Sequence, residues 1–446
     1  MKKLWKFLLD NSLLLVIGAV VALIWANCGE AAQHFYHHIL EAHFDFMDNT
    51  IFGSDAINEE TKQKIINTTD GGFFLQEGAV LKHFDIHYLI NDFLMAFFFM
   101  AAGKEVFEAT FPGGALHNPK QAATPLIATA GGVLGPIGVF CLIVLLFSSI
   151  SGFGPHEVDG NTLGAAFQAK DGSWHSLYDG WAVPTATDIA FSAMIARIIF
   201  GGRHPAVPFL LLLAIADDAV GLVIIAIVFG AGFGLNTAIG LGVVVALMLF
   251  GYFVLNKKLH CNSWVPYFLL MLISWFCFGY AGIHTSLGFI PIVFCMPHAE
   301  KDEGVHSDDE RGKEDALNKI QSVFYVPTEI ILGLFGWASA GVALTTIGFP
   351  TAAVAFALII GKMVGIFLFG GASGKILGLP EGMSYKDLLV LGSAAGIGFT
   401  VALFVAGEAF PDGDVKDAAK LGALLSLGSM VVAFILSKIC KTERRA

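Results

Sequence analysis

Long apolar segments, separated by polar connections, cover most of this chain of 446 residues. Twelve of them supply, or nearly supply, the roughly 20 apolar residues with which an α-helix crosses the core of a bilayer. They lie at 11–27, 87–103, 122–147, 185–199, 206–230, 236–255, 264–281, 283–297, 321–345, 351–370, 388–408 and 418–437. The pattern predicts an all-α membrane protein, with about 12 transmembrane helices in one multi-pass domain over residues 1–446.

The composition supports a membrane protein. Hydrophobic residues make up 55% of the chain and charged residues 14%, whereas soluble domains carry about 25% charged residues. The net charge of −11 is concentrated in the connections, so it does not indicate nucleic-acid binding, and we expect the lipid bilayer as the main partner. The six cysteines form no CxxC pair and are expected to pack among apolar residues.

Lysines and arginines gather outside the first and last apolar segments. Because such residues in short loops stay on the cytoplasmic side, both termini are expected to be cytoplasmic, which an even number of spans satisfies. The terminal residues concerned are Lys2, Lys3, Lys6, Lys438, Lys441, Arg444 and Arg445. Connection residues predicted on the same side are Lys104, Lys120, Arg197, Arg203, Lys257, Lys258, Lys375 and Lys386. A cleaved signal peptide at the first segment is an alternative, which would leave an odd number of spans.

Three longer polar segments interrupt the pattern. Residues 28–86 and 148–183 are predicted insertions on the outer side, and 298–320 is a predicted cytoplasmic linker between two halves. Within the first insertion, His34 and His38 are four residues apart and would share one face of a helix. That face could hold a metal ion, or the segment could simply be a polar one at the membrane interface.

Two apolar segments carry internal breaks at related positions. The segment 185–199 begins within VPTATDIAF (183–191), and 388–408 contains GIGFTVALF (396–404); each is the middle member of a triplet, and the triplets have opposite predicted orientation. Broken helices in inverted halves are typical of the binding site of a secondary transporter. The backbone groups freed at a break must lie inside protein or against a water-filled cavity. Simple kinks at Pro184, Gly396 and Gly398 are the alternative.

Only a few ionisable residues fall within the apolar segments. They are Asp92, Asp188, Asp217, Asp218 and Lys362. Each charge at the centre of a span costs about 2.5–3.5 kcal/mol on scales for insertion into a membrane. Asp92 lies near the end of its span, and the other four charges would cost on the order of 10 kcal/mol if unpaired. Like charges and burial both favour the protonated form of a carboxylate, so an adjacent pair of aspartates can exchange protons for a cation. Pairing of Asp217 with Lys362 for structure alone is the alternative.

Several motifs resemble those of the NhaA-type sodium/proton antiporter family. They are ATDIAF (186–191), AIADDAVG (214–221), IIGKMVGI (359–366), LPEGMSY (379–385) and GIGFT (396–400), together with INDFLMAFFF (90–99) and GIHTS (282–286). The resemblance covers essentially every predicted span and leaves out the two outer insertions. This family is itself a known example of inverted repeats, so the repeat and the resemblance are not independent indications.

The resemblance implies the NhaA-like fold, in which two discontinuous helices cross near the midplane. It implies that Asp218 is the principal ligand of the transported Na⁺, that Asp217 is the second acidic residue and pairs with Lys362 when the ion is absent, and that Thr187 lies near the ion. Asp188 would compensate the positive helix ends at the crossing, and Lys362 the negative ends.

The resemblance also implies regulation by pH. Glu105 matches the acidic residue at a cytoplasmic funnel mouth, and His284 matches a histidine that influences the pH response. The family typically reads Gly-Leu-Glu-Val-Lys-Arg-Glu at the funnel, whereas this chain reads GKEVFEA (103–109), with Phe107 in place of lysine and Ala109 in place of the second glutamate. Before the ninth span, Asn318 and Lys319 replace the usual Glu-His. These differences predict a shifted pH set-point.

The resulting hypothesis is an electrogenic Na⁺/H⁺ antiporter of a bacterial inner membrane, with Li⁺ as a second substrate. Hard cations suit carboxylate, hydroxyl and carbonyl oxygens. The Walker pattern is absent from the sequence, and neither a resident cofactor nor enzymatic activity is expected. A homodimer is compatible with the resemblance, although the long outer loops prevent its interface from being carried over. The alternatives are a sodium-coupled symporter of an organic anion and a membrane sensor that does not transport.

Overall fold

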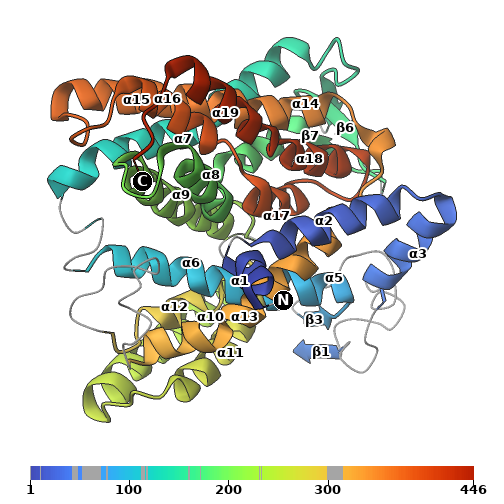
Figure 1. The fold of residues 1–446 in the computed structure, drawn as a ribbon. Coiled ribbons are helices and arrows are strands. Elements are labelled where there is room, and N and C mark those ends of the chain that lie inside the picture. The colour runs from blue at the N-terminus through green and yellow to red at the C-terminus, as the bar shows by residue number, and fades with distance from the viewer. Residues whose placement is uncertain are drawn as a thin grey trace. The chain divides into compact units, whose positions relative to one another are not determined.

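A computed structural model describes most of the chain, and Figure 1 shows its fold. The described residues are 2–10, 12–42, 49–52, 72–76, 79–111, 116, 119–158, 161–170, 172–230, 232, 234–298 and 315–445. The chain divides into two compact units, which are described separately. The first comprises Met1–Ser12, Ala115–Gly221 and Val342–Ala446, and the second Leu13–Gly114 and Leu222–Gly341.

The first unit contains most of the helices that carry the predicted ion site. Its elements are α1 (Lys2–Asp10), α7 (Pro119–Phe147), β4 (His156–Val158), β5 (Asn161–Leu163), β6 (Ala166–Gln168), β7 (Trp174–Ser176), η2 (Leu177–Thr185), α8 (Ile189–Phe200), α9 (Ala206–Val228, which continues past Gly221 into the second unit), η6 (Leu344–Thr346), α14 (Phe349–Phe356), η7 (Ala357–Gly361), α15 (Lys362–Leu377), α16 (Tyr385–Ala394), α17 (Phe399–Ala409), α18 (Asp414–Leu425) and α19 (Gly428–Cys440).

The second unit is held together by a buried aromatic and aliphatic cluster that includes Phe97, Trp275 and Phe289. Its strands form one antiparallel sheet in the order β1-β3-β2. Its elements are α2 (Leu13–Ala26), α3 (Glu30–Leu40), β1 (Asn49–Phe52), β2 (Gly72–Gln76), β3 (Ala79–His83), α5 (Ile86–Tyr88), η1 (Leu89–Leu94), α6 (Met95–Ala109), α10 (Leu235–Leu249), η3 (Phe250–Lys258), α11 (Trp264–Ala281), η4 (Thr285–Leu287), α12 (Ile290–Val293) and α13 (Ala316–Ser339).

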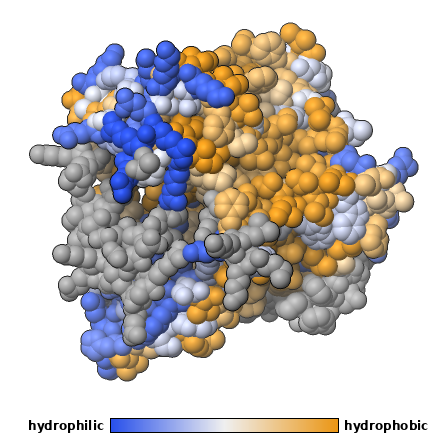
Figure 2. Space-filling view, in the orientation of Figure 1, coloured by the Kyte–Doolittle hydropathy of each residue, from blue (hydrophilic) through white to orange (hydrophobic). Residues whose placement is uncertain are grey.

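The predicted all-α membrane fold is confirmed. Among the described residues, eight helices are long and apolar enough to cross a membrane, and two bent helix pairs bring the number to as many as ten. The eight are Ile86–Ala109, Ala122–Phe147, Ala206–Val228, Leu235–Lys258, Trp264–Ala281, Ala316–Ser339, Phe349–Leu377 and Asp414–Cys440. Figure 2 shows apolar side chains gathered over much of the visible surface, as expected for helices that face lipid.

Besides the two bent pairs, two of the twelve predicted spans differ from single long helices. Residues 11–27 contain α2, a shorter apolar helix of 14 residues. Residues 283–297 contain only the short elements η4 and α12. Gly282, with φ of 69°, ends α11, and Gly288 packs its backbone against α11, where a Cβ atom would lie 2.6 Å from Trp275 Cα. These two glycines turn the chain back onto α11 instead of continuing a helix.

The polar segments have structure of their own. The predicted insertion 148–183 contains two hairpins, β4–β5 and β6–β7, but its last residues already belong to η2, which begins at Leu177. The insertion 28–86 contains α3 and the three-stranded sheet. His34 and His38 are exposed on α3, and within the described part of the chain no group of three or more His, Cys, Asp and Glu side chains could hold a metal ion. Most of the linker 298–320 lies outside the described residues, and α13 starts at Ala316.

Helix α15, which begins with Lys362, packs backbone to backbone on α7, beside which it runs in Figure 1. A Cβ atom at Gly131 would lie 2.2 Å from the carbonyl oxygen of Gly365, and one at Gly365 would lie 2.0 Å from that of Gly131. Small residues allow membrane helices to approach this closely. The contact therefore fixes the position of α15, and of Lys362 with it.

Candidate functional site

Two helices of the first unit are broken where the sequence predicts breaks. η2 and α8 meet at an angle of 49°, and α16 and α17 at 52°. The two breaks contact each other directly, since the backbone N–H of Asp188 donates to the carbonyl oxygen of Ile397 at 2.7 Å. The interruptions are therefore changes in chain direction that belong to one structural centre, rather than independent kinks.

Asp188 lies at the N-terminal ends of α8 and α17, the half-helices that follow the two breaks. It is the N-cap of α8, and its carboxylate accepts from the backbone N–H of Phe191 at 3.3 Å. The same carboxylate accepts from the backbone N–H of Thr400, in the first turn of α17, at 3.3 Å and from the Thr400 hydroxyl. Helix N-termini carry partial positive charge, so one buried carboxylate serves two of them.

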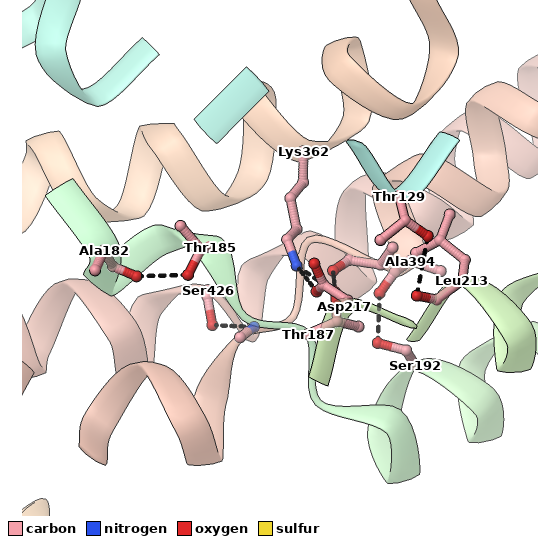
Figure 3. A network of polar contacts seen from close by, with 12 residues as sticks. Thr129, Ala182, Thr185, Thr187, Ser192, Leu213, Asp217, Lys362, Ala394 and Ser426 are labelled. Carbon is pink, nitrogen blue, oxygen red and sulfur yellow. Dashed lines mark hydrogen bonds and ion pairs between the residues drawn. The ribbon is translucent and has the colours of Figure 1, made fainter. Parts of the chain in front are cut away.

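Lys362 lies at the centre of the site (Figure 3). Its side chain is fully buried at the start of α15, and its ammonium group contacts the Asp217 carboxylate of α9 and the Thr187 hydroxyl of the first break. A buried ion pair is tolerated only when further hydrogen bonds satisfy both partners. The structure thus brings together three residues that lie 30 to 175 positions apart in the sequence, Thr187, Asp217 and Lys362.

The second aspartate of the pair differs from the first in exposure. Asp217 is 1% exposed, whereas Asp218 is only partly buried. Adjacent residues of a helix point about 100° apart, so the two carboxylates have different surroundings. Asp218 still interacts electrostatically with Lys362. The buried Oδ1 atom of Asp217 makes no hydrogen bond to the described residues, which leaves an oxygen donor suited to a hard cation.

The hydroxyl of Ser192, which the sequence analysis did not single out, joins that of Thr187 at this centre. Thr187 donates to the carbonyl oxygen of Ala395 at 3.2 Å, and Ser192 donates to that of Ala394 at 3.0 Å. Both carbonyls belong to the C-terminal end of α16, where helical partners are missing. The signal was in the sequence, because Ser and Thr inside an apolar segment with a break can satisfy the freed backbone groups.

Glu105 lies in the second unit, partly exposed on α6. The preceding residue, Lys104, was predicted in a connection after the span 87–103, but the structure places it inside α6, which continues to Ala109. Lys104 is 2% exposed within α6 and forms an ion pair with Glu108 one turn later. Phe107, which replaces a typical family lysine, packs against the rings of Phe111 and Phe294, with centroids 4.6 and 5.0 Å away.

His284 also lies in the second unit, at the start of η4. Its Nδ1 atom is 2.8 Å from the hydroxyl oxygen of Ser286 and 3.4 Å from the Asp92 carboxylate. The Thr285 hydroxyl donates to the same carboxylate at 2.6 Å. Asp92, which the sequence analysis treated as an isolated charge, therefore belongs to a polar cluster around His284. It lies in the π-helical turn η1, a feature frequent at functional sites.

Paired helix breaks around buried charges are the architecture in which secondary transporters bind their ions. The fold and the site therefore define a class, that of multi-span helical transporters. The family follows from sequence comparison: the model of the family described as Na+/H+ antiporter 1 matches residues 56–155 and 165–438. The chain belongs to this Na⁺/H⁺ antiporter family, which implies Na⁺ and H⁺ as the transported ions.

Relatives over the full chain agree. The chain is 41% identical to the Na(+)/H(+) antiporter NhaA of Jannaschia sp. (strain CCS1), with 100% of each chain covered. It is 36% identical to that of Desulfitobacterium hafniense (strain DSM 10664 / DCB-2), covering 98% of this chain and 96% of the relative. It is also 36% identical to that of Geotalea uraniireducens (strain Rf4), covering 100% and 99%. The family resemblance inferred from the motifs is confirmed.

Proposed function

We propose that the protein is an electrogenic antiporter that exports cytoplasmic Na⁺ in exchange for external protons. The observation that carries this proposal is the contact of the Lys362 ammonium with Asp217 and Thr187, at the point where two broken helices meet and next to Asp218. Such a centre holds two carboxylates and one ammonium in the interior of a membrane protein. Its total charge can therefore change by binding either a cation or protons.

The proposed exchange is a competition for carboxylate oxygens. Na⁺ enters through the more exposed Asp218 and takes oxygen ligands from Asp218, Asp217 and the Thr187 hydroxyl. Its charge displaces the Lys362 ammonium from Asp217. A buried lysine that has lost its counter-ion favours the neutral form, so Lys362 releases one proton, and Asp218 releases the other. Two protons exchanged for one Na⁺ would move net charge across the membrane.

Two charges compensate the helix ends at the breaks before Na⁺ binds. Asp188 bonds the N-terminal turns of α8 and α17. We propose that it neutralises their positive ends, and that the Lys362 ammonium does the same for the negative ends of η2 and α16. Because neither break can be solvated by lipid, the compensation by Asp188 would persist on either side of an alternating-access cycle, whereas that by Lys362 would hold while its amine is protonated.

The finer features of the proposal follow the family. Li⁺, a small hard cation like Na⁺, would be a second substrate. The bacterial inner membrane, with both termini cytoplasmic, would be the location. Glu105 and His284 would modulate the response to pH, and a homodimer is a compatible assembly. The two insertions would lie on the outer side and the linker on the cytoplasmic side of one transporter domain, with the insertion 148–183 ending where η2 begins and the linker ending where α13 begins.

Inverted membrane vesicles that contain the protein test the proposal. A proton gradient is first built up by respiration, and Na⁺, Li⁺ or K⁺ is then added at pH values from 6.5 to 9. We expect Na⁺ and Li⁺, but not K⁺, to collapse the gradient. Vesicles from the same cells without the protein are the control. Collapse only in the presence of an organic acid, with no response to Na⁺ alone, would instead favour a sodium-coupled organic anion symporter.

A further inference from the structure

Two serines of the last span reach the break between α16 and α17. Ser426 follows α18, and Ser429 lies in the first turn of α19. Both side chains are fully buried. Because the chain between α18 and α19 is itself irregular at 426–427, the two hydroxyls point into the first unit at the level of the break, and Ser426 appears there in Figure 3.

The two hydroxyls bond opposite ends of the break. Ser429 donates to the carbonyl oxygen of Ser393, in the last turn of α16, at 2.7 Å. Ser426 donates to the carbonyl of Ala423 in its own helix at 2.6 Å, which leaves its oxygen free to accept from the backbone N–H of Gly398 at 3.2 Å. Gly398 immediately precedes α17, so one serine serves the negative end of α16 and the other the positive end of α17.

The carbonyl that Ser429 bonds belongs to a row of three. Ser393, Ala394 and Ala395 are successive residues, and their carbonyl oxygens accept from Ser429, Ser192 and Thr187 respectively. Ser429 comes from α19, whereas Ser192 of α8 and Thr187 of the break before it come from the other broken span. The last of them, Thr187, is also the hydroxyl that contacts the Lys362 ammonium. The position of Thr187 against Lys362 therefore depends on where this row of carbonyls is held.

The backbone of the α16–α17 break is closely packed and has no space to follow another path. A Cβ atom at Gly396 would lie 2.4 Å from Ser429 Oγ and 2.9 Å from the carbonyl oxygen of Leu358. Gly396 thus passes directly between the last span and the helix that leads to Lys362. Loss of the Ser426 hydroxyl would leave the backbone N–H of Gly398 without its partner, in a place that lipid and bulk water do not reach. Loss of the Ser429 hydroxyl would leave the Ser393 carbonyl with one donor instead of two, the backbone N–H of Gly396 at 3.2 Å.

We propose that Ser426 and Ser429 are positioning residues of the ion exchange, which hold the α16–α17 break so that the Ala395 carbonyl fixes Thr187 beside Lys362. The inference rests on the proposed Na⁺/H⁺ exchange. It assigns to the last span a direct role in the geometry of the ion site, although that span contributes no charged group to it.

The test compares Ser426→Ala and Ser429→Ala with a matched control, Ser373→Ala. Ser373 is also buried, but its hydroxyl donates at 3.1 Å to Gly370 of its own helix α15. In proteoliposomes we expect each test variant to raise the apparent KM for Na⁺ about five-fold. The maximal rate should change less than two-fold, because a lost hydrogen bond that orients a ligand weakens ion binding. The ratio of the KM values for Na⁺ and Li⁺ should also change.

A second readout separates positioning from mere support. Na⁺ raises the melting temperature of a protein that binds it in the folded state only. We expect the test variants to lose most of this Na⁺-dependent increase while keeping the melting temperature measured without Na⁺ close to that of the control. If an alanine variant does not fold, Ser429→Cys or Ser426→Cys, which keep a weaker hydrogen-bonding group, should show an intermediate KM.

The outcomes are distinct. Absence of Na⁺-dependent exchange in the unmodified protein would contradict the proposed function itself. Exchange in the unmodified protein, together with a KM and a Na⁺/Li⁺ ratio in the folded serine variants equal to those of Ser373→Ala, would overturn the positioning role alone. Normal KM values in the cysteine variants would overturn it equally.

Discussion

At the scale of single residues, Lys362 is the group that most clearly connects structure with exchange. It is fully buried, and it contacts both an acidic residue and a hydroxyl at the crossing. Two roles suit this geometry, a carrier of one exchanged proton and a fixed charge that stabilises helix ends. They differ in whether the ammonium has to lose its proton during each cycle. The charge moved per transported Na⁺ therefore separates them.

Replacement of Lys362 by Gln, which is neutral and of similar length, separates the two roles. If Lys362 carries a proton, exchange survives, and the current per transported Na⁺ falls in proteoliposomes. If Lys362 only neutralises helix ends, the melting temperature falls, and the charge per ion is unchanged. We expect the first result. An unaltered ratio of current to flux in a folded Lys362→Gln protein would rule out the proton-carrier role.

His204, in the connection between α8 and α9, gives a pH-dependent stability. Burial lowers the pKa of His204 below its ordinary value near 6.5, and the side chain stacks on Phe200, with Nδ1 accepting from the backbone N–H of Ala206 at 3.1 Å. The charged groups that face it are Asp387, which opposes the effect of burial, Arg445, which adds to it, and Glu443, which opposes it. The folded protein therefore binds fewer protons here than the unfolded chain just below pH 6.5.

The stability that His204 provides is thus complete above about pH 6.5, the pKa of histidine in the unfolded chain. It is lost as the pH falls toward the lower pKa that His204 has in the folded protein. We predict that the melting temperature of the unmodified protein exceeds that of His204→Gln at pH 7.5 and that this difference narrows by pH 5.5. His34→Gln, at an exposed position of α3, is the control. A difference between the two proteins that does not vary with pH would show that His204 does not titrate in this way.

At the scale of elements, the sequence located the two breaks because Pro, Gly and Asp interrupt otherwise apolar segments at 183–191 and 396–404. It did not locate η2, whose residues Leu177–Thr185 read as part of a polar insertion. The cause is the local composition. Ser176 and Asp179 form the capping box of a buried helix, but in the sequence these two polar residues look like part of a loop. Likewise 283–297 is apolar enough for a span, yet close packing of Gly288 on α11 turns it into short elements.

The contact between α7 and α15 yields a stability prediction. Gly131→Ala would place a methyl group 2.2 Å from the carbonyl oxygen of Gly365, so the two helices must move apart. We expect a loss of about 1–3 kcal/mol, as for other overpacked interiors, measured as a lower melting temperature in detergent. Gly138→Ala, in the same helix, is the control, because nothing lies within 4 Å of its added Cβ atom. Equal melting temperatures of the two variants would contradict the backbone contact.

The C-terminal half of α6 yields a prediction about pH response. Phe107 lies in an aromatic cluster where the family typically has lysine, and Ala109 replaces a glutamate. These neutral residues change the local electrostatic field near Glu105. We expect the double variant Phe107→Lys, Ala109→Glu to move the pH at which exchange begins. Phe111→Leu, which perturbs the same cluster without adding charge, should not. An unchanged pH profile of the double variant would show that this part of α6 does not set it.

At the scale of the whole molecule, apolar patterning and the order of the motifs were sufficient to predict the all-α membrane fold and the family. The choice of Asp217 as the partner of Lys362 came from the family resemblance and not from spacing, because Asp217 and Asp218 are adjacent and only their helical phase decides which one meets Lys362. The serines of the last span were also not readable. Ser429 bonds a residue 36 positions away, and ordinary serines in an apolar span carry no sequence signal for such a contact.

The central claim is that the aspartate pair at the crossing exchanges Na⁺ for protons, and Asp218→Asn tests it most directly. The substitution keeps the size of the side chain but removes its charge and its titratable proton. The measurement is Na⁺-driven proton flux in proteoliposomes at matched protein content, with the melting temperature as a check of folding. The account predicts a folded Asp218→Asn protein with no Na⁺-dependent proton flux, beside an unmodified protein with robust flux. Undiminished flux in the folded variant would contradict it.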